Sequence, residues 1–402
     1  MTKPPLNVFA GAAPVGRLAR SEVDEAAVLF GYREAIAPAN AVSLTMPIRA
    51  DQYAAIAGLP IFEMNLPEGA LRERLRSKFA KAIPEFDDLD LLRIVGSSQI
   101  GRLRFSPDER IDPAVPEQDL DEILTYTGST DLFAHLLERF ATYSGVSGLQ
   151  PKVLVRAGGA AEKRARPGAT HIVKAFDAGE YPELAANEFI CTAGASAAGI
   201  RTASMRLAAN GRWLIVERFD LASDGSPLGL EDFCVLDGRH AHGRYDGSYE
   251  RIARRITDFV SPRALAAARQ QYALTVVYAC TIGNGDAHLK NFSVLYRHAE
   301  DVVELAPAYD LVATQVYLPR DSLALTMQES KEFPRRDRLI RFVRHVTGKT
   351  EKGAAQLLEQ VKAGAEHAIA EARRYGKLHV GARVVIGRLI DVVRAGLQRL
   401  DA

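Results

Sequence analysis

The sequence is poor in the features that mark secreted, membrane-spanning and zinc-binding proteins. Its only cysteines, Cys191, Cys234 and Cys280, are far apart and form no CxxC pair. This spacing predicts thiols in a reducing compartment and does not suit a zinc site, whose ligands lie closer together. No stretch approaches the roughly 18 apolar residues of a membrane helix, and MTKPPLNVFAGAAPVG at the start lacks the apolar core of a secretory signal. We expect a cytoplasmic protein.

The chain also lacks an excess of either charge. Its formal net charge is +1, which argues against a surface built mainly to hold nucleic acid. Hydrophobic residues make up 47% and charged residues 25%, values typical of a globular protein with a sizeable core. A length of 402 residues predicts two or three domains.

Three regions differ in pattern along the chain. Residues 1–105 read as a small α/β subdomain, with hairpins in LNVFAGAAPVGRLAR and LRIVGSSQIGRLRFSP and a helix in LPEGALRERLRSKFAKAI. Residues 106–217 begin with a Pro-rich acidic linker and one helix around TDLFAHLLERF, followed by the strands KVLVRA, HIVKAF and RWLIVERF and a loop, GGAAEKRARPG, between the first two. Residues 218–402 are mainly helical. This order predicts an α+β, two-lobed fold like that of protein kinases.

The segment IGNGDAHLKNF carries the strongest chemical signal. Asp286 and Asn291 have the D-x-x-x-x-N spacing of a kinase catalytic loop. There the Asp takes or orients the proton of the acceptor hydroxyl, and the Asn carbonyl oxygen binds Mg²⁺. His288 and Lys290 would add positive charge toward the phosphates. The bare spacing also fits an ordinary turn after a buried helix.

Three further residues follow the order of kinase parts. Asp310, in LAPAYDLVAT, holds the place of the second Mg²⁺ ligand, although an Asp that caps a turn would look the same. Lys174 in HIVKAF could reach the α- and β-phosphates of ATP. Glu188 lies on an otherwise apolar helical stripe, where a charge needs a partner, and Lys174 is the predicted one.

Two segments complete the set. In YSGVSGLQPKVLVR, glycines flank Ser147 just before a strand, so backbone N–H groups could face phosphate oxygens. The end of RWLIVERFD, from Glu217 to Phe219, leads into the helical half and is the predicted hinge that reads adenine. Together, these residues and segments follow the order of the parts of a protein kinase: phosphate loop, Lys, helix Glu, hinge, Asp–Asn pair and metal Asp.

Several longer blocks, SGLQPK, THIVK, NEFIC, VERFD, GNGDAHLKNFS and APAYD, together resemble the HipA family of serine/threonine kinase toxins from toxin–antitoxin modules. SLTMPIR and FEMNLPEGALRERL resemble the N-terminal subdomain of that family, so the likeness covers nearly the whole chain. It implies an ATP- and Mg²⁺-dependent kinase with an atypical N-lobe. It also implies a helix-turn-helix antitoxin partner resembling HipB, contact with operator DNA through that partner, and an aminoacyl-tRNA synthetase as substrate.

The resemblance also implies roles for individual residues. Asp286, Asn291 and Lys174 would be catalytic, Asn291 and Asp310 would bind the metal, and Lys174 and Glu188 would form an ion pair. The ATP site would comprise Ser147, Gly148, Leu149, Gln150, Pro151, Lys152, Lys174, Glu217, Arg218, Phe219, His288, Leu289, Lys290, Asn291, Tyr309 and Asp310.

Two departures from the family pattern affect self-regulation and substrate choice. The Ser-x-Ser-Gly motif of many relatives has Gly145 at its first position here, so autophosphorylation is predicted at Ser147. Near the expected substrate side, Arg244 and Tyr245 replace a Lys-Tyr pair, which makes a change of target plausible.

Two other functions compete with a toxin kinase. Aminoglycoside and choline kinases also use an Asp with an Asn five residues later, so a small-molecule kinase is one alternative. A non-catalytic co-repressor subunit is the other, because ARRYGKLHVGARVVIGRLIDVVRAGLQRL carries enough arginine to touch DNA phosphates.

Overall fold

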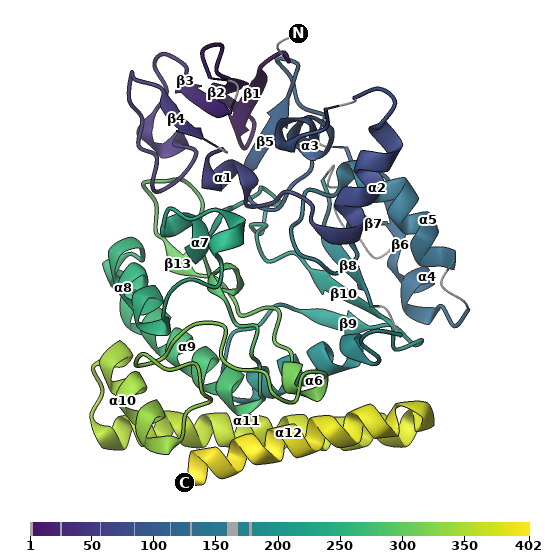
Figure 1. The fold of residues 1–402 in the computed structure, drawn as a ribbon, viewed down its shortest axis with the longest axis vertical. Coiled ribbons are helices and arrows are strands. Elements are labelled where there is room, and N and C mark those ends of the chain that lie inside the picture. Colours follow the sequence, from purple (N-terminus) through teal and green to yellow (C-terminus); the bar gives the residue numbers. More distant parts are fainter. Residues whose placement is uncertain are drawn as a thin grey trace. The chain divides into compact units, whose positions relative to one another are not determined.

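The computed structural model describes residues 3–24, 26–56, 58–83, 85–112, 114–128, 131–158, 168–176 and 179–402 (Figure 1). The chain forms two compact units, each built from separate stretches of sequence. The first comprises Met1–Ala175, Ala208–Ala241 and Leu295–Val302, and the second Phe176–Leu207, His242–Val294 and Val303–Ala402. The three-domain division at 105 and 217 stays a prediction.

The first unit opens with an antiparallel sheet in the order β4-β3-β2-β1-β5. Its strands are β1 (Leu6–Ala10), β2 (Ala13–Arg20), β3 (Ala27–Tyr32), β4 (Tyr53–Ile56) and β5 (Leu103–Ser106). The predicted first hairpin is confirmed, with Gly11 at a positive φ of 62° in its turn. Pro14 lies inside β2, opposite Phe9, where the register shifts and a missing N–H is tolerated.

The predicted second hairpin is wrong. Its first half belongs to helix α3 (Asp88–Val95), and only its second half is a strand, β5, which pairs with β1. The helix is fixed by a capping box in which Asp87 accepts the N–H of Asp90 and Asp90 accepts that of Asp87, both at 3.0 Å. The short helices α1 (Pro60–Glu63) and η1 (Pro38–Asn40) and the predicted helix, α2 (Gly69–Phe79), complete this region.

A second sheet carries the predicted strands of the N-lobe. β6 (Glu117–Asp119), β7 (Lys152–Gly158), β8 (His171–Ala175) and β10 (Trp213–Glu217) are neighbours in that order, so the three predicted strands are confirmed. The single linking helix is wrong, because the segment forms α4 (Leu120–Thr125), α5 (Asp131–Phe140) and η2 (Ala141–Tyr143). The predicted loop after β7 lies mostly outside the described residues. β11 (Gly229–Asp232) and α7 (Phe233–Leu236) also belong to this unit.

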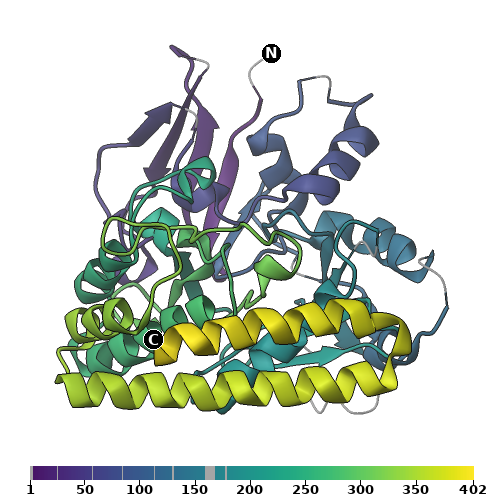
Figure 2. The ribbon, with the colours of Figure 1, turned by 60° about the horizontal axis from the view of Figure 1, so that its bottom comes forward.

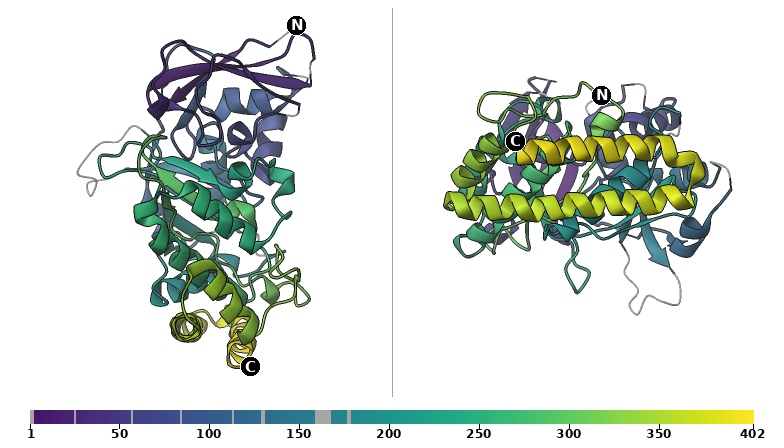
Figure 3. Two further views of the ribbon diagram at one scale, coloured as in Figure 1. Left: turned by 90° about the vertical axis from the view of Figure 1, so that its left-hand side faces the viewer. Right: turned by 90° about the horizontal axis from the view of Figure 1, so that it is seen from below.

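The second unit is mainly helical, as predicted. Its helices are α6 (Leu184–Ala197), α8 (Tyr249–Phe259), α9 (Pro262–Thr281), α10 (Arg336–Thr347), α11 (Glu351–Leu378) and α12 (Arg383–Asp401). Shorter elements are β9 (Met205–Leu207), β13 (Glu304–Leu305), η4 (Leu289–Asn291), η5 (Thr314–Val316) and η6 (Val380–Ala382), while η3 (Ala241–Gly243) and β12 (Ser293–Tyr296) span the division. Figures 2 and 3 show α11 and α12 side by side and antiparallel. None of the helices described is both long and apolar enough to cross a membrane.

Glycines let the helices of the second unit approach closely. A Cβ on Gly194 of α6 would lie 2.7 Å from the carbonyl oxygen of Gly364 in α11. A Cβ on Gly364 would lie 2.6 Å from Ala198 Cβ. Helix α9 runs through this core, where Tyr278 is fully buried and its hydroxyl donates to the Cys191 carbonyl at 2.7 Å. The end of α9 is therefore held firmly.

A substitution in α12 tests this packing. A Cβ on Gly396 would collide with the carbonyl of Thr281, the last residue of α9. We expect Gly396→Ala to lower the free energy of unfolding by about 1–3 kcal/mol, as overpacking does. Gly387→Ala on the same helix meets nothing within 4 Å and should be neutral or stabilise by up to about 1 kcal/mol. Urea unfolding of both variants checks this, and equal stability would contradict the packing described.

Candidate active site

The candidate catalytic loop begins where α9 ends. Gly283 reverses the chain with a φ of +68°. The N–H of Asn284 then donates to the Ala279 carbonyl at 2.9 Å, and its side-chain oxygen accepts the N–H of Asp286 at 2.9 Å. Asn284 is buried, so its side-chain amide is held in place and fixes the backbone of Asp286.

A second segment, residues 314–321, holds the same loop from the other side. The N–H of Gly285 donates to Thr314 Oγ1 at 2.8 Å, and that hydroxyl donates to Asp321 at 2.5 Å. Positions 283 and 285 require glycine because neighbouring side chains approach the backbone closely there. A Cβ on Gly283 would lie 2.6 Å from Val392 Cγ1, and one on Gly285 would collide with the Asp321 carboxylate.

Buried aromatic side chains support the next part of the loop. The Tyr249 hydroxyl donates to the Ala287 carbonyl at 3.1 Å, and the Tyr272 hydroxyl donates to the Tyr249 carbonyl at 2.8 Å. Both rings pack edge-to-face against Phe292 and Phe342. A catalytic loop held by such a core loses little entropy when it binds a ligand.

The side chain of Asp286 is exposed to solvent and lies among other charged groups. Tyr245 donates its hydroxyl to Asp286 Oδ1 at 2.8 Å. Partial burial raises the pKa of Asp286, and the negative charges of Asp310 and Asp321 raise it further, while the Tyr245 hydrogen bond and Arg244 oppose the rise. A carboxylate with a raised pKa is a better proton acceptor than an ordinary surface Asp.

His288 differs from the prediction made for it. Burial, Arg244 and Lys290 lower the pKa of His288 to about 4. The imidazole is therefore neutral at pH 7, and the predicted positive charge from this residue is wrong. Its Nδ1 is buried and has no hydrogen-bond partner among the residues that the structure describes.

Asp310 lies close to the candidate catalytic loop, although it follows Asp286 by 24 positions in the sequence. Its charge raises the pKa of both Asp286 and His288, which indicates that its carboxylate lies near both side chains. Asp310 has a φ of +55°, a left-handed conformation that is costly outside glycine and frequent at functional sites. Tyr309 fixes the preceding position, since its hydroxyl donates to the Lys290 carbonyl at 2.7 Å.

These residues fit Mg²⁺ and a nucleotide phosphate. Asn291 Oδ1 accepts the His288 N–H at 3.0 Å and keeps a second lone pair. The Asp310 carboxylate is the second oxygen donor of the predicted pair, and two protein ligands are enough for Mg²⁺ because it keeps waters and phosphate oxygens. The orphaned Nδ1 of His288 marks a polar position that a ligand can fill.

In the first unit, the predicted phosphate loop precedes β7. Gly148 has a φ of +118°, and Lys152 Nζ donates to the Ser147 carbonyl at 3.0 Å. In the β7–β8 pair, Lys152 lies directly opposite Lys174, and both are buried. Two cationic side chains at opposed positions of neighbouring strands suit a polyphosphate ligand, whose charge is opposite to theirs. The structure thus brings the two predicted lysines together.

The predicted hinge residues and Glu188 lie outside the candidate catalytic loop. Glu217 ends β10 and is exposed. Arg218 is buried, its N–H donates to the Thr170 carbonyl at 3.0 Å, and its guanidinium pairs with Asp220 at 2.6 Å. Glu188 is buried in α6, in the other unit from Lys174, and their ion pair stays a prediction.

The site also contains residues whose contacts the sequence did not reveal. Arg244 and Tyr245 stood out only as a changed pair, and nothing in the sequence pointed to a hydrogen bond across 41 positions. Thr314 and Asp321 carried no signal at all.

Comparison with known proteins bears directly on this site. Residues 6–106 match the HipA N-terminal domain model, and residues 144–369 match the HipA-like C-terminal domain model, which contains the candidate loop. The protein named "Putative kinase Y4mE" of Sinorhizobium fredii is 28% identical over 79% of both chains. "Putative kinase Y4dM" of the same organism is 28% identical over 68% of this chain and 66% of its own length.

The Shewanella oneidensis serine/threonine-protein kinase toxin HipA is 27% identical over 56% of this chain and 57% of its own. A solved complex of HipA, HipB and operator DNA from that organism contains a chain with the same fold, at a TM-score of 0.72, 20% identity and 98% coverage of both chains. Because the C-terminal domain model alone spans more than half of the 402 residues, this protein belongs to the HipA family of kinases.

Proposed function

We propose that this protein transfers the γ-phosphoryl group of ATP to a serine or threonine of another protein and acts as the toxin of a toxin–antitoxin module. The observation that carries the proposal is the accessible Asp286 carboxylate, held by Tyr245 and placed near Asp310. Asp286 would accept the proton of the attacking hydroxyl, and Asn291 and Asp310 would hold Mg²⁺, which would offset the charge of the phosphates.

Basic side chains and backbone N–H groups bind the phosphates of ATP. Lys152 and Lys174 pair with phosphate oxygens, together with the N–H groups of the loop from Ser147 to Pro151. Neutral His288 offers its Nδ1 to a phosphate-bound water or hydroxyl. Glu217 to Phe219 receive adenine, and Ser147 is the site of autophosphorylation.

The names of similar proteins indicate which partners this protein would have. A Shewanella HipA is named a serine/threonine-protein kinase toxin, and another structure holds HipA with HipB and operator DNA. We propose a HipB-like antitoxin for this chain, contact with operator DNA through that antitoxin, and a translation component such as an aminoacyl-tRNA synthetase as substrate.

Labelling of a bacterial lysate with γ-³²P-ATP tests this function. We expect the wild-type protein to label one or a few proteins on serine or threonine, and its expression to stop growth unless the antitoxin is co-expressed. Asp286→Asn should do neither. Label on sugars or amino alcohols with none on protein would overturn the proposal in favour of a small-molecule kinase.

Tyr245 should set the pH at which the kinase becomes active. Asp286 accepts a proton only when ionised, so activity is lost as pH falls through its raised pKa. Tyr245→Phe removes a hydrogen bond that stabilises the ionised form, so the pKa rises further and the acid limb of the kcat profile moves to higher pH. Profiles from pH 5 to 9 check this, with Tyr181→Phe, whose ring packs on Tyr317, as the control. An unmoved acid limb would contradict the assigned role.

A further inference from the structure

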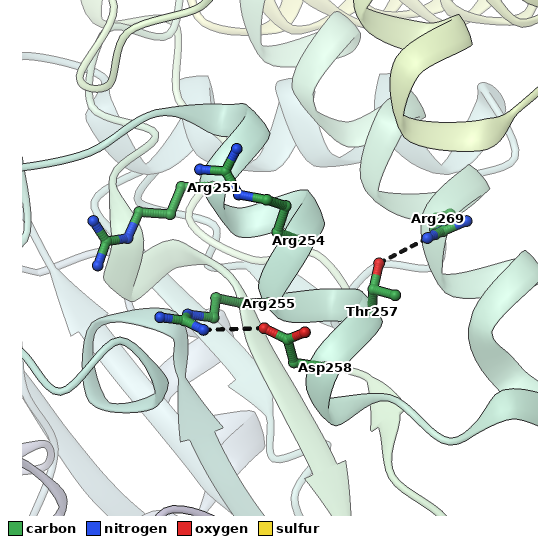
Figure 4. A pocket seen from close by; sticks show the side chains of 6 residues that line it. All are labelled: Arg251, Arg254, Arg255, Thr257, Asp258 and Arg269. Atoms are coloured by element: carbon green, nitrogen blue, oxygen red, sulfur yellow. Dashed lines mark hydrogen bonds and ion pairs between the residues drawn. The ribbon is translucent and has the colours of Figure 1, made fainter.

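Helices α8 and α9 form a hollow lined by arginine. Its volume is about 440 Å³, and its lining consists of Arg251, Arg254, Arg255, Thr257, Asp258 and Arg269. Arg254 and Arg255 lie three and four residues after Arg251, which places both of them beside Arg251 on the surface of α8. Figure 4 shows them on that helix and Arg269 on its neighbour. We call this region the arginine hollow.

Among the six lining residues of the hollow, arginines outnumber acidic residues by four to one. Arg255 pairs with Asp258 at 3.0 Å, and Arg269 donates to the neutral Thr257 hydroxyl at 2.7 Å. Asp258 is thus the one acidic residue among four arginines in the lining. A neighbouring hollow of about 630 Å³ shares Arg254, but its lining also includes Glu250 and Glu329, which equal its two arginines in number.

The arginine hollow lies beside the catalytic loop. At Gly247, an added Cβ would lie 3.9 Å from Arg251 Cδ and 3.9 Å from Leu289 Cδ2. Arg244 continues the positive charge toward Asp286, since its carbonyl accepts the Leu289 N–H at 3.1 Å and its charge lowers the pKa of Asp286. Arg251 Cδ and Leu289 Cδ2 are therefore less than about 8 Å apart, a span of roughly two or three extended peptide residues.

We infer that the arginine hollow docks an acidic segment of the protein substrate that flanks the phosphorylated serine or threonine. This inference rests on the proposed function and names the substrate class for it. The planar fork of arginine binds carboxylates with two parallel hydrogen bonds. The arginines define specificity by charge and contribute to KM, whereas the transfer step belongs to the catalytic loop.

The observations favour a peptide over a nucleic acid. The net charge of the chain is +1, so it lacks the broad positive field that gathers polynucleotides. None of the six lining residues is aromatic, so the hollow offers no platform for stacking a base. The hollow is also local, whereas phosphate contacts to a duplex extend along a track.

Synthetic peptides with one central serine flanked by Asp/Glu, Gln or Lys test the inference. We expect wild-type protein to bind the acidic peptide about 10-fold more tightly than the Gln peptide, in fluorescence anisotropy without ATP and in KM, because a few exposed ion pairs contribute several-fold each. Arg254→Glu should reverse this preference, so that the Lys peptide binds more tightly than the acidic peptide. It should leave kcat for the Gln peptide unchanged. Arg373→Glu, an equal charge change at an exposed position of α11, is the control and should keep the wild-type order.

Peptide binding without ATP tests the docking site independently of kinase activity. Acidic-peptide binding that Arg254→Glu removes, without any phosphorylation, would support the docking site and overturn the kinase assignment. Phosphorylation with no preference among the three peptides would overturn the docking site alone. Arg254→Glu that instead weakens binding of a labelled DNA or RNA duplex, with peptide binding unaffected, would show that the hollow serves nucleic acid and overturn the inference.

Discussion

Replacing Asp286 by Asn should lower kcat for phosphoryl transfer by about 10²–10⁴-fold, the usual contribution of a positioned general base. The amide keeps the shape of the side chain and can still meet the Tyr245 hydroxyl, which donates to the carboxylate at 2.8 Å in the wild type. What it loses is the ability to accept the acceptor's proton. Single-turnover rates with saturating ATP measure this loss.

ATP affinity distinguishes a chemical defect from a folding defect in this variant. Since Asp286 is not among the proposed nucleotide ligands, the dissociation constant for ATP should stay within about 3-fold of wild type, under about 0.7 kcal/mol. Asp51→Asn, at an exposed Asp of the first unit, is the matched control and should retain full activity. Wild-type rates in Asp286→Asn would refute the role of this residue.

The second large effect is expected at Asp310. Asp310→Asn removes the proposed carboxylate ligand of Mg²⁺, whose charge stabilisation amounts to several kcal/mol, so the rate should fall by at least about 10²-fold. Asparagine is the suitable replacement because it tolerates the left-handed backbone found there, at a φ of +55°, better than alanine. A Mg²⁺ titration of activity, and of the thermal stabilisation by ATP, checks the assignment.

A pH profile adds an independent test of the same variant. The charge of Asp310 raises the pKa of Asp286, so its removal should lower that pKa. The acid limb of the residual activity should then move to lower pH, opposite to the shift expected for Tyr245→Phe. Shifts in the same direction would show that the two side chains do not act on Asp286 as described.

The helices of the second unit were predictable, and the candidate catalytic loop could be located, because their signals are local. Asp286 and Asn291 lie within one turn and a short helix, and their spacing alone suggested the chemistry. The helices α9, α11 and α12 are long enough for periodicity to be clear. Helix α3 was missed because a β-rich apolar run, LLRIV, outweighed the capping box formed by Asp87 and Asp90.

The electrostatics of the site depend on contacts that no local pattern contains. The charge expected on His288 was wrong because burial, together with the charge of Arg244, which lies 44 positions earlier, lowers its pKa to about 4. Tyr245 reaches Asp286 across 41 positions, and Thr314 and Asp321 hold Gly285 from another loop. Such contacts follow from how α8, α9 and the later loops pack, which the order of motifs along the chain does not determine.

The most direct measurement of the central claim compares two labels of ATP. Incubation of the wild-type chain and a bacterial lysate with γ-³²P-ATP should place label on phosphoserine or phosphothreonine of a lysate protein. The same incubation with α-³²P-ATP should place none there, and Asp286→Asn should abolish the γ-label. Label from the α-phosphate, or γ-label that survives in Asp286→Asn, would contradict a phosphotransfer centre built on Asp286, Asn291 and Asp310.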